Sequence, residues 1–237
     1  MTTISKQIVA MGGGGFSMEP ENSLLDKYIL GLSPKQIPKI CFVPTASGED
    51  DKYIVRFYSA FIQQSCKPSH LSLFNPPTSD ISSFLLEQDI IYVGGGNTKN
   101  LIALWKEWGL DSILKEAWES GIILCGLSAG SICWFEQGVT ESIPQQMTVL
   151  QCLGFLKGSN CPHYDGEKEG RPSYHRLLSQ GLISEGYAAD DYVGLHFIGD
   201  KLEKIVSSRV HAKAYKLEKI GDTVKETCLE PIYLGKI

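Results

Sequence analysis

Short apolar runs alternate with segments of helical periodicity over the first half of the chain. Each run is mostly apolar, without regular alternation, and ends at glycine, proline or polar residues, which predicts strands at 7–11, 39–43, 71–74, 89–93 and 121–125. Apolar residues recur every three to four positions in the segments between them, which predicts helices at 22–32, 50–64, 81–87, 101–108 and 110–119. Strands that are apolar without alternation are typical of a sheet covered on both faces. The alternation therefore predicts an α/β fold with a doubly wound, mostly parallel sheet flanked by helices.

The last part of the chain has a different pattern, with strand-like segments separated by short turns. Gly199-Asp200 and Gly221-Asp222 each stand between two such segments and are typical of hairpin turns. We expect these strands to extend the same sheet in antiparallel orientation. No Pro/Ser-rich linker divides the chain, so we predict a single α/β domain over residues 1–237. The expected strands are 192–198, 204–207, 211–217 and 223–233.

Composition and charge exclude several classes of protein. Of 237 residues, 43% are hydrophobic and 21% are charged, which is ordinary for a globular chain and unlike a disordered or fibrous one. The net charge is −5, whereas proteins that bind nucleic-acid phosphates are normally basic. No apolar run approaches the roughly 20 residues that span a bilayer, and residues 1–6 lack the pattern of an export signal. We therefore expect a cytoplasmic protein that binds neither nucleic acid nor membranes.

The seven cysteines are scattered along the chain, and no two of them form a Cys-x-x-Cys pair. An odd number of cysteines without an export signal argues against a disulfide framework. Their spacing does not match a structural zinc site either. We therefore expect neither a bound metal nor another cofactor.

The strongest chemical signal is the pentapeptide Gly126-Leu-Ser-Ala-Gly130. It follows an expected strand and precedes an expected helix, which is the setting of a nucleophile elbow. The tight turn needs small neighbours and projects the hydroxyl of Ser128 above the strand ends. There the N–H of Ala129, at the start of the helix, can stabilise an oxyanion. The alternative is an ordinary glycine-rich turn between a strand and a helix.

A second glycine-rich loop, Gly94-Gly-Gly-Asn97, also joins a strand to a helix. The carboxyl ends of parallel strands share one edge of the sheet, so we expect this loop beside Ser128. Gly95 or Gly96 could then offer a second N–H to the oxyanion, and Asn97 is a candidate substrate-binding residue. The alternatives are a phosphate site or simple turn chemistry. Neither this loop nor residues 12–15 match a nucleotide-binding motif.

A serine nucleophile needs a base, and five histidines are available. We favour His163, because Asn160-Cys-Pro-His-Tyr164 is a loop without strand or helix periodicity, where polar function commonly lies. His196 falls in a strand-like run typical of a core histidine, and His175 falls on an expected helix. These two are the alternatives, and His70 is expected to be structural.

A carboxylate is expected to orient the histidine. If residues 129–137 are helical, Glu136 lies about 12 Å along the helix axis from Ser128, too far for one small site. Gly138 would end that helix and return the chain toward the sheet, which favours Glu141 as the acid. Two further acids near His163 are interpreted as solvated loop charges: Asp165 and Glu167.

These motifs occur in the order in which a known family has them. Four segments carry the likeness: Phe42-Val-Pro-Thr-Ala46, Gly94-Gly-Gly-Asn-Thr98, Gly126 to Ser131 and Cys161-Pro-His-Tyr164. Over nearly the whole chain, from Met11 to about Tyr215, the sequence resembles the dipeptidase E serine peptidases. That group includes aspartyl dipeptidases and is related to cyanophycinase.

The resemblance implies a fold similar to class I glutamine amidotransferases, a Ser-His-acid triad and no metal. It matches Ser128 to the nucleophile, His163 to the base, and the glycine loop with Ala129 to the oxyanion hole. Glu141 is the nearest match to the acid of the triad, although its spacing from the serine differs from that of the aspartyl dipeptidases.

The family's known activity is cleavage after an N-terminal aspartate, whose side chain is read by an arginine. Arg171 and Arg176 lie in the corresponding stretch, and either could pair with a carboxylate through two hydrogen bonds. Pro172 departs from the pattern of the Asp-specific members. The alternative is a surface arginine that covers the start of a helix.

The sequence therefore predicts a serine peptidase that hydrolyses short peptides, with N-terminal Asp-X dipeptides as a candidate substrate class. The first alternative is an α/β-hydrolase-type esterase, which shares the elbow but usually carries its histidine later in the chain. The second is a non-catalytic small-molecule-binding module on the same fold. Three tryptophans on expected helices are assigned to the core, with a homodimer face as the alternative: Trp105, Trp108 and Trp118.

Overall fold

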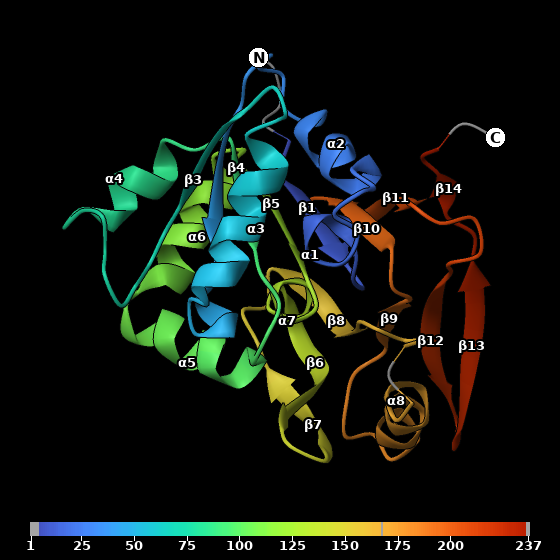
Figure 1. Cartoon of the computed structure of the whole chain (residues 1–237). Helices are drawn as coiled ribbons and strands as arrows, with labels where there is room; N and C mark the ends of the chain where they lie inside the picture. The colour runs from blue at the N-terminus through green and yellow to red at the C-terminus, as the bar shows by residue number, and fades with distance from the viewer. Residues whose placement is uncertain (1–4, 167, 236–237) are drawn as a thin grey trace.

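The computed structural model describes residues 5–166 and 168–235, which form two β-sheets flanked by helices (Figure 1). In spatial order, the larger sheet contains β14 (Ile232–Tyr233), β11 (Lys201–Ser207), β10 (Val193–Ile198), β1 (Gln7–Met11), β5 (Ile123–Leu127), β4 (Ile90–Val93), β2 (Lys39–Val43) and β3 (Lys67–His70). The smaller sheet contains β13 (Thr223–Leu229), β12 (Ala214–Ile220), β9 (Gly186–Ala189), β8 (Leu156–Cys161), β6 (Phe135–Ile143) and β7 (Gln146–Gln151).

The helices are α1 (Gly15–Met18), α2 (Leu24–Leu30), α3 (Asp51–Phe61), α4 (Ile81–Leu86), α5 (Thr98–Glu107), α6 (Leu110–Glu119), α7 (Ala129–Ile132) and α8 (Gly170–Ser179), with a short 3₁₀ helix η1 (Thr45–Ser47). Strands β1, β5, β4, β2 and β3 are parallel to one another. β10 runs antiparallel to both of its neighbours, β1 and β11. The predicted class, an α/β fold with a mostly parallel sheet and antiparallel C-terminal strands, is confirmed.

Both faces of the parallel sheet are buried. Within β1, Ile8 and Ala10 belong to the core shared with α4, α5 and α6. Val9 and Met11 point the other way, into the core shared with α1, α2 and α3. Since alternate side chains of a strand enter opposite faces, the buried positions of β1, β2, β4 and β5 are all apolar, aromatic or glycine, and only the half-buried first residues of β1 and β2, Gln7 and Lys39, are polar. This is the pattern from which the sequence predicted them.

One predicted strand is displaced along the chain. The apolar segment 71–74 follows β3 and is not part of it. β3 is an edge strand whose four residues, Lys67 to His70, are all partly or fully exposed, so it lacks an apolar run. Leu71 and Leu73 enter the core just beyond its end. Leu71 and Leu73 were therefore recognised correctly as buried, whereas Phe74 is 67% exposed and the strand was misplaced.

The predicted helix over 129–137 is wrong beyond its first turn. α7 has only four residues, and the chain then forms β6 of the smaller sheet. Gly138 lies inside β6, opposite Asn160 of β8, and does not end a helix. Trp134 and Phe135 enter the core beneath the larger sheet, which draws the chain away from a continuing helix.

The predicted extension of the larger sheet is correct only in part. β10 and β11 extend it antiparallel, and the hairpin turn at Gly199-Asp200 joins them. β12 and β13 form the second predicted hairpin, but they belong to the smaller sheet.

Trp105 and Trp118 are buried, while Trp108 is 42% exposed. No described helix has the length and apolar character needed to cross a membrane.

Candidate active site

The carboxyl ends of the parallel strands bring the sequence motifs to one edge of the sheet. Ser128 directly follows β5, and its backbone N–H donates to the carbonyl of Met11 at the end of β1 (3.2 Å). The N–H of Gly94, after β4, donates to the carbonyl of Val43 at the end of β2 (3.1 Å). The elbow and both glycine-rich loops therefore begin side by side.

The turn around Ser128 has the geometry of a nucleophile elbow. Ser128 has φ 55° and ψ −117°, a backbone conformation that L-residues rarely adopt. A Cβ added to Gly126 would lie 2.4 Å from the carbonyl oxygen of Gly130, and one added to Gly130 would lie 2.3 Å from that of Val93. Only glycine fits at either position, which explains the spacing of the motif.

The glycine loop lies against the serine. A Cβ on Gly95 would be 3.2 Å from the Cβ of Ser128. The N–H of Gly95 itself donates to the hydroxyl of Tyr53 (3.3 Å). Within the described part of the chain, the N–H groups of Gly96 and Ala129 have no hydrogen-bond partner. Those two groups are therefore available to an oxyanion without breaking an internal bond.

Asn97 has two internal roles. Its side-chain oxygen accepts the N–H of Asn100 and caps α5 (3.0 Å), and its amide nitrogen donates to the carbonyl of Ser142 on β6 (2.8 Å). The side chain thus ties the glycine loop to the hairpin of β6 and β7.

A buried side-chain hydrogen bond ties the strand that leads to His163 to the helix that follows Ser128. The amide nitrogen of Asn160, at the end of β8, donates to the hydroxyl of Ser131 on α7 (2.7 Å). Ser131 is three residues after Ser128, and His163 is three residues after Asn160. His163 has φ 50°, so its backbone is also strained.

The carboxylate that contacts this histidine is Asp191, which the sequence analysis did not single out. Nδ1 of His163 donates to Oδ1 of Asp191 at 2.5 Å, and the two side chains are 18% and 15% exposed. A Cβ on Gly13 would lie 2.1 Å from the same carboxylate oxygen, so the glycine run after β1 makes the space for it. Because Nδ1 holds the proton in this bond, Nε2 is the basic nitrogen of the neutral ring.

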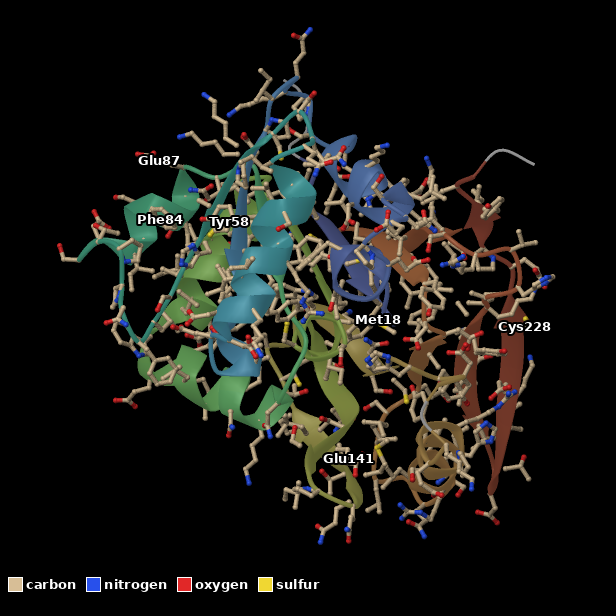
Figure 2. All side chains as sticks on the ribbon, viewed as in Figure 1. Met18, Tyr58, Phe84, Glu87, Glu141 and Cys228 are labelled. Atoms are coloured by element: carbon tan, nitrogen blue, oxygen red, sulfur yellow. The ribbon has the colours of Figure 1, made fainter. Side chains whose placement is uncertain are left out.

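Glu141 lies elsewhere. It is on the exposed hairpin of β6, where its carboxylate accepts the N–H of Gln145 (2.7 Å). Figure 2 shows Glu141 at the far end of β6, apart from Met18. The sulfur of Met18 and the carboxylate of Asp191 both lie beside Gly13, so Met18 marks the region of Asp191 in the figure. Asp165 accepts the backbone N–H of Asp191 (2.9 Å). Glu167 lies outside the described residues.

The two predicted arginines differ in their surroundings. Arg171 makes two hydrogen bonds to the carboxylate of Glu226, and its guanidinium lies over the rings of Tyr164 and Tyr215. Arg176 is exposed on α8 and lines a cavity of about 690 Å³ between α8 and the hairpin of β6 and β7. This cavity is also lined by Glu141, Glu169 and Ser173.

Three of the other four histidines have structural partners. His196 is 3% exposed and contacts the hydroxyl of Tyr28 (2.7 Å), as expected of a core histidine, and burial lowers its pKa. His175 contacts Glu226 (2.7 Å), and His70 contacts the hydroxyl of Tyr58 (2.9 Å). No cluster of three or more His, Cys, Asp or Glu side chains suited to a metal ion occurs among residues 5–166 and 168–235.

Comparisons of the sequence with known proteins give consistent matches. The model of peptidase family S51 matches residues 8–205. The uncharacterized peptidase YgaJ of Bacillus subtilis (strain 168) is 60% identical over 230 residues, which cover 97% of this chain and 100% of that protein. The uncharacterized peptidase PM1590 of Pasteurella multocida (strain Pm70) is 31% identical over 102 residues, covering 41% of this chain and 48% of that protein.

Two solved structures share the fold. A peptidase from an acI-B1 Actinobacterium gives a TM-score of 0.63 at 18% identity, covering 96% of this chain and 95% of that one. A chain from Listeria monocytogenes EGD-e, described as a peptidase E protein, gives 0.61 at 19% identity, covering 86% of this chain and 98% of that one.

Proposed function

Since the chain belongs to peptidase family S51 and is a serine-type peptidase, we propose that Ser128 is its nucleophile and His163 its general base. The observation that carries the proposal is the strained elbow of Ser128 at the sheet edge where the hydrogen-bonded pair of His163 and Asp191 lies. Backbone strain of this kind is characteristic of functional sites.

The proposed reaction is acyl transfer. The hydroxyl oxygen of Ser128 forms a bond to the peptide carbonyl carbon while Nε2 of His163 takes its proton. The N–H groups of Ala129 and Gly96 stabilise the resulting oxyanion, each at about 3 kcal/mol by analogy with other serine peptidases. The C–N bond then breaks as His163 protonates the leaving amine. Water hydrolyses the acyl-enzyme by the same steps in reverse.

Asp191 takes the orienting role that the sequence analysis gave to Glu141. The support is the 2.5 Å hydrogen bond to Nδ1 of His163, whereas Glu141 bonds to Gln145 on an exposed hairpin. A carboxylate in this position fixes the tautomer and stabilises the imidazolium that forms during the reaction.

The proposed substrates are short peptides, and the cavity beside α8, which none of Ser128, His163 and Asp191 lines, is the candidate site for the part of a peptide away from the scissile bond. Arg176 and Glu141 line this cavity and can pair with a carboxylate and an ammonium group respectively. Arg171 is already paired with Glu226, so Arg176 is the better candidate to bind an acidic side chain of the substrate. A homodimer and a cytoplasmic location remain predictions of the sequence.

The first experiment is hydrolysis of Asp-X, Glu-X and neutral dipeptides and of longer peptides, followed by mass spectrometry. Wild type is expected to cleave dipeptides, and Ser128→Ala to lose the activity. Ser112→Ala, an exposed serine on α6, serves as control. If Ser128→Ala keeps the activity, the nucleophile is misassigned. If folded wild type neither cleaves peptides nor reacts with a fluorophosphonate probe, the binding module gains support, and cleavage of esters alone would favour the esterase.

The second test separates the two acids. Asp191→Asn is expected to lower kcat by about 10³- to 10⁴-fold, since an amide no longer holds the required tautomer. Glu141→Gln is expected to keep the rate of fluorophosphonate labelling of Ser128 and to change only KM. The opposite result, a large fall in labelling for Glu141→Gln alone, would return the acid to Glu141.

A further inference from the structure

Glu226 lies on β13, outside residues 8–205 that the family model matches, yet its side chain reaches the loop of His163. Its carboxylate is 14% exposed. It accepts the hydroxyl of Tyr164 (2.6 Å), contacts Nε2 of His175 (2.7 Å), and accepts two hydrogen bonds from Arg171. A single carboxylate of the C-terminal hairpin thus holds three side chains from the segment between β8 and the end of α8.

Tyr164 is the contact that matters for His163, because the two residues are adjacent in the chain. Tyr164 is 3% exposed, and its ring lies 5.1 Å from that of Tyr215 on β12. Its N–H donates to the carbonyl of Ala189 (3.1 Å). With one end fixed by this backbone bond and the other by Glu226, the Tyr164 side chain has little freedom to move.

His163 needs such support because its backbone is strained. A positive φ at a residue that is not glycine persists only where the surrounding structure over-determines it. The imidazole must also stay within a fraction of an ångström of its productive position for efficient proton transfer. A rigidly held neighbouring residue therefore contributes more to the placement of His163 than it would to that of an ordinary loop residue.

The charge of Glu226 is maintained despite its burial. Burial alone would raise the pKa of its carboxyl, but the hydrogen bonds from Tyr164, His175 and Arg171 lower the pKa below its ordinary value. Hydrogen bonds to a charged acceptor are stronger than those between neutral groups. The ionised form therefore anchors the loop more firmly than a neutral group could.

We propose that Glu226 is a positioning residue of the peptidase: through Tyr164 it holds His163 in place for catalysis, so the C-terminal hairpin completes the active site. The inference rests on the proposed role of His163 as general base. It assigns β12 and β13, which lie wholly beyond the part matched by the family model, a role in the reaction rate.

The test compares Glu226→Ala and Glu226→Gln with Glu218→Gln. Glu218 is a matched control, since it forms an ion pair with Lys216 (2.7 Å) on the same hairpin. Two quantities are measured at a temperature where all variants are folded: peptide kinetics, and the rate of fluorophosphonate labelling of Ser128. Glu226→Ala is expected to lower kcat and the labelling rate by about 10- to 100-fold with little change in KM. Glu226→Gln should fall between Ala and wild type, and Glu218→Gln should match wild type.

A double-mutant cycle with Tyr164→Phe tests whether Glu226 acts on His163 through Tyr164. This variant removes only the hydroxyl, and the ring keeps its packing. If Glu226 acts through Tyr164, the effects of Tyr164→Phe and Glu226→Gln on the labelling rate are expected to be non-additive. Additive effects would overturn this route, as would labelling rates equal to wild type in folded Glu226 variants. A change confined to KM would make Glu226 a specificity residue instead.

The failure of the inference can be told from that of the proposed function. If wild type is active and Glu226→Ala is equally active, only the inference fails. If wild type shows neither hydrolysis nor labelling, the proposed function fails. With an active wild type, NMR of the ring nitrogens of His163 gives a second readout: loss of the Nδ1 hydrogen bond in Glu226→Ala, and not in Glu218→Gln, supports the positioning role. An unchanged Nδ1 signal would overturn it.

Discussion

Backbone strain gathers around the candidate site. Among the five described non-glycine residues with positive φ are Ser128, His163 and Tyr192, at 55°, 50° and 73°. Tyr192 directly follows Asp191, and its N–H donates to the carbonyl of Gly13 (3.2 Å). Each of the three proposed triad members therefore either has a positive φ or precedes a residue that does. Such strain costs about 1–3 kcal/mol a residue and persists where the surroundings enforce it.

Asp26, on α2, is a buried carboxyl whose charge should destabilise the protein. It is 3% exposed, and its Oδ1 has no hydrogen-bond partner in the described part of the chain. Burial raises its pKa from 3.8 to about 7, against an opposing hydrogen bond from the backbone of Phe16. The folded protein therefore binds more protons than the unfolded chain between about pH 4 and pH 7. The stability due to this group is complete below pH 4 and is lost as the pH rises to 7.

Asp26→Asn stays neutral and is expected to escape this loss. It should be more stable than wild type by roughly 2–4 kcal/mol at pH 8, and by much less at pH 4.5. Urea unfolding at several pH values measures the difference. The pKa of Asp190 is also raised by burial, to about 6, but this residue is present in both proteins and cancels. A difference that does not change with pH would contradict the expected protonation of Asp26.

Residue types and spacing identified the candidate nucleophile and base but not the carboxylate. Ser128 and His163 stand in local motifs with a chemical reason for each neighbour. Asp191 belongs to no motif and reaches His163 only because β10 pairs antiparallel with β1. That register places Gly194 opposite Met11, so the residues just before β10 lie at the edge where β1 ends. The sequence predicted an antiparallel strand at 192–198, directly after Asp191. It could not show that this strand pairs with β1, which is what brings Asp191 to the site.

At the scale of elements, the sequence pattern identified the strands that are buried on both faces and the hairpin of β12 and β13. It did not identify the other strands of the smaller sheet, which are β6, β7, β8 and β9. β6 and β8 mix exposed and buried residues and follow no simple alternation. The segment after the elbow, with its run of apolar residues, resembled the start of a helix. Its path depends on the core that Trp134 and Phe135 enter, which is a property of the tertiary structure.

The substitution Gly138→Ala tests the packing of β6 against α7. In β6, an added Cβ would lie 2.1 Å from Cγ2 of Ile132 on α7, so we expect a loss of about 1–3 kcal/mol in the free energy of unfolding. Urea denaturation measures it. Ser112→Ala, on exposed α6, should show the small gain typical of a helix. A gain at Gly138 as well would contradict this packing.

At the scale of the whole molecule, the two sheets share one core. Phe197 of β10, in the larger sheet, contacts Phe135 of β6 and Tyr187 of β9, with ring centroids 5.7 Å apart in both cases. The apolar cluster beneath the larger sheet also contains Leu156, Ala189 and Ala214 from or beside strands of the smaller one. Loss of packing in either sheet would therefore expose part of this shared cluster, and a single domain over residues 1–237 remains a prediction.

Phe197→Ala is therefore expected to destabilise both sheets together, by about 3–5 kcal/mol. Hydrogen exchange measures this by segment: protection of β1 and β5 in one sheet, and of β8 and β9 in the other, should fall by the same factor. Ile198→Ala is the control, because the neighbouring side chain on the same strand is 41% exposed and should cost far less. If protection falls in the smaller sheet alone, the sheets unfold separately. The smaller sheet carries Glu226 on β13, and His163 lies just after β8, so such separate unfolding would also release the histidine from the serine.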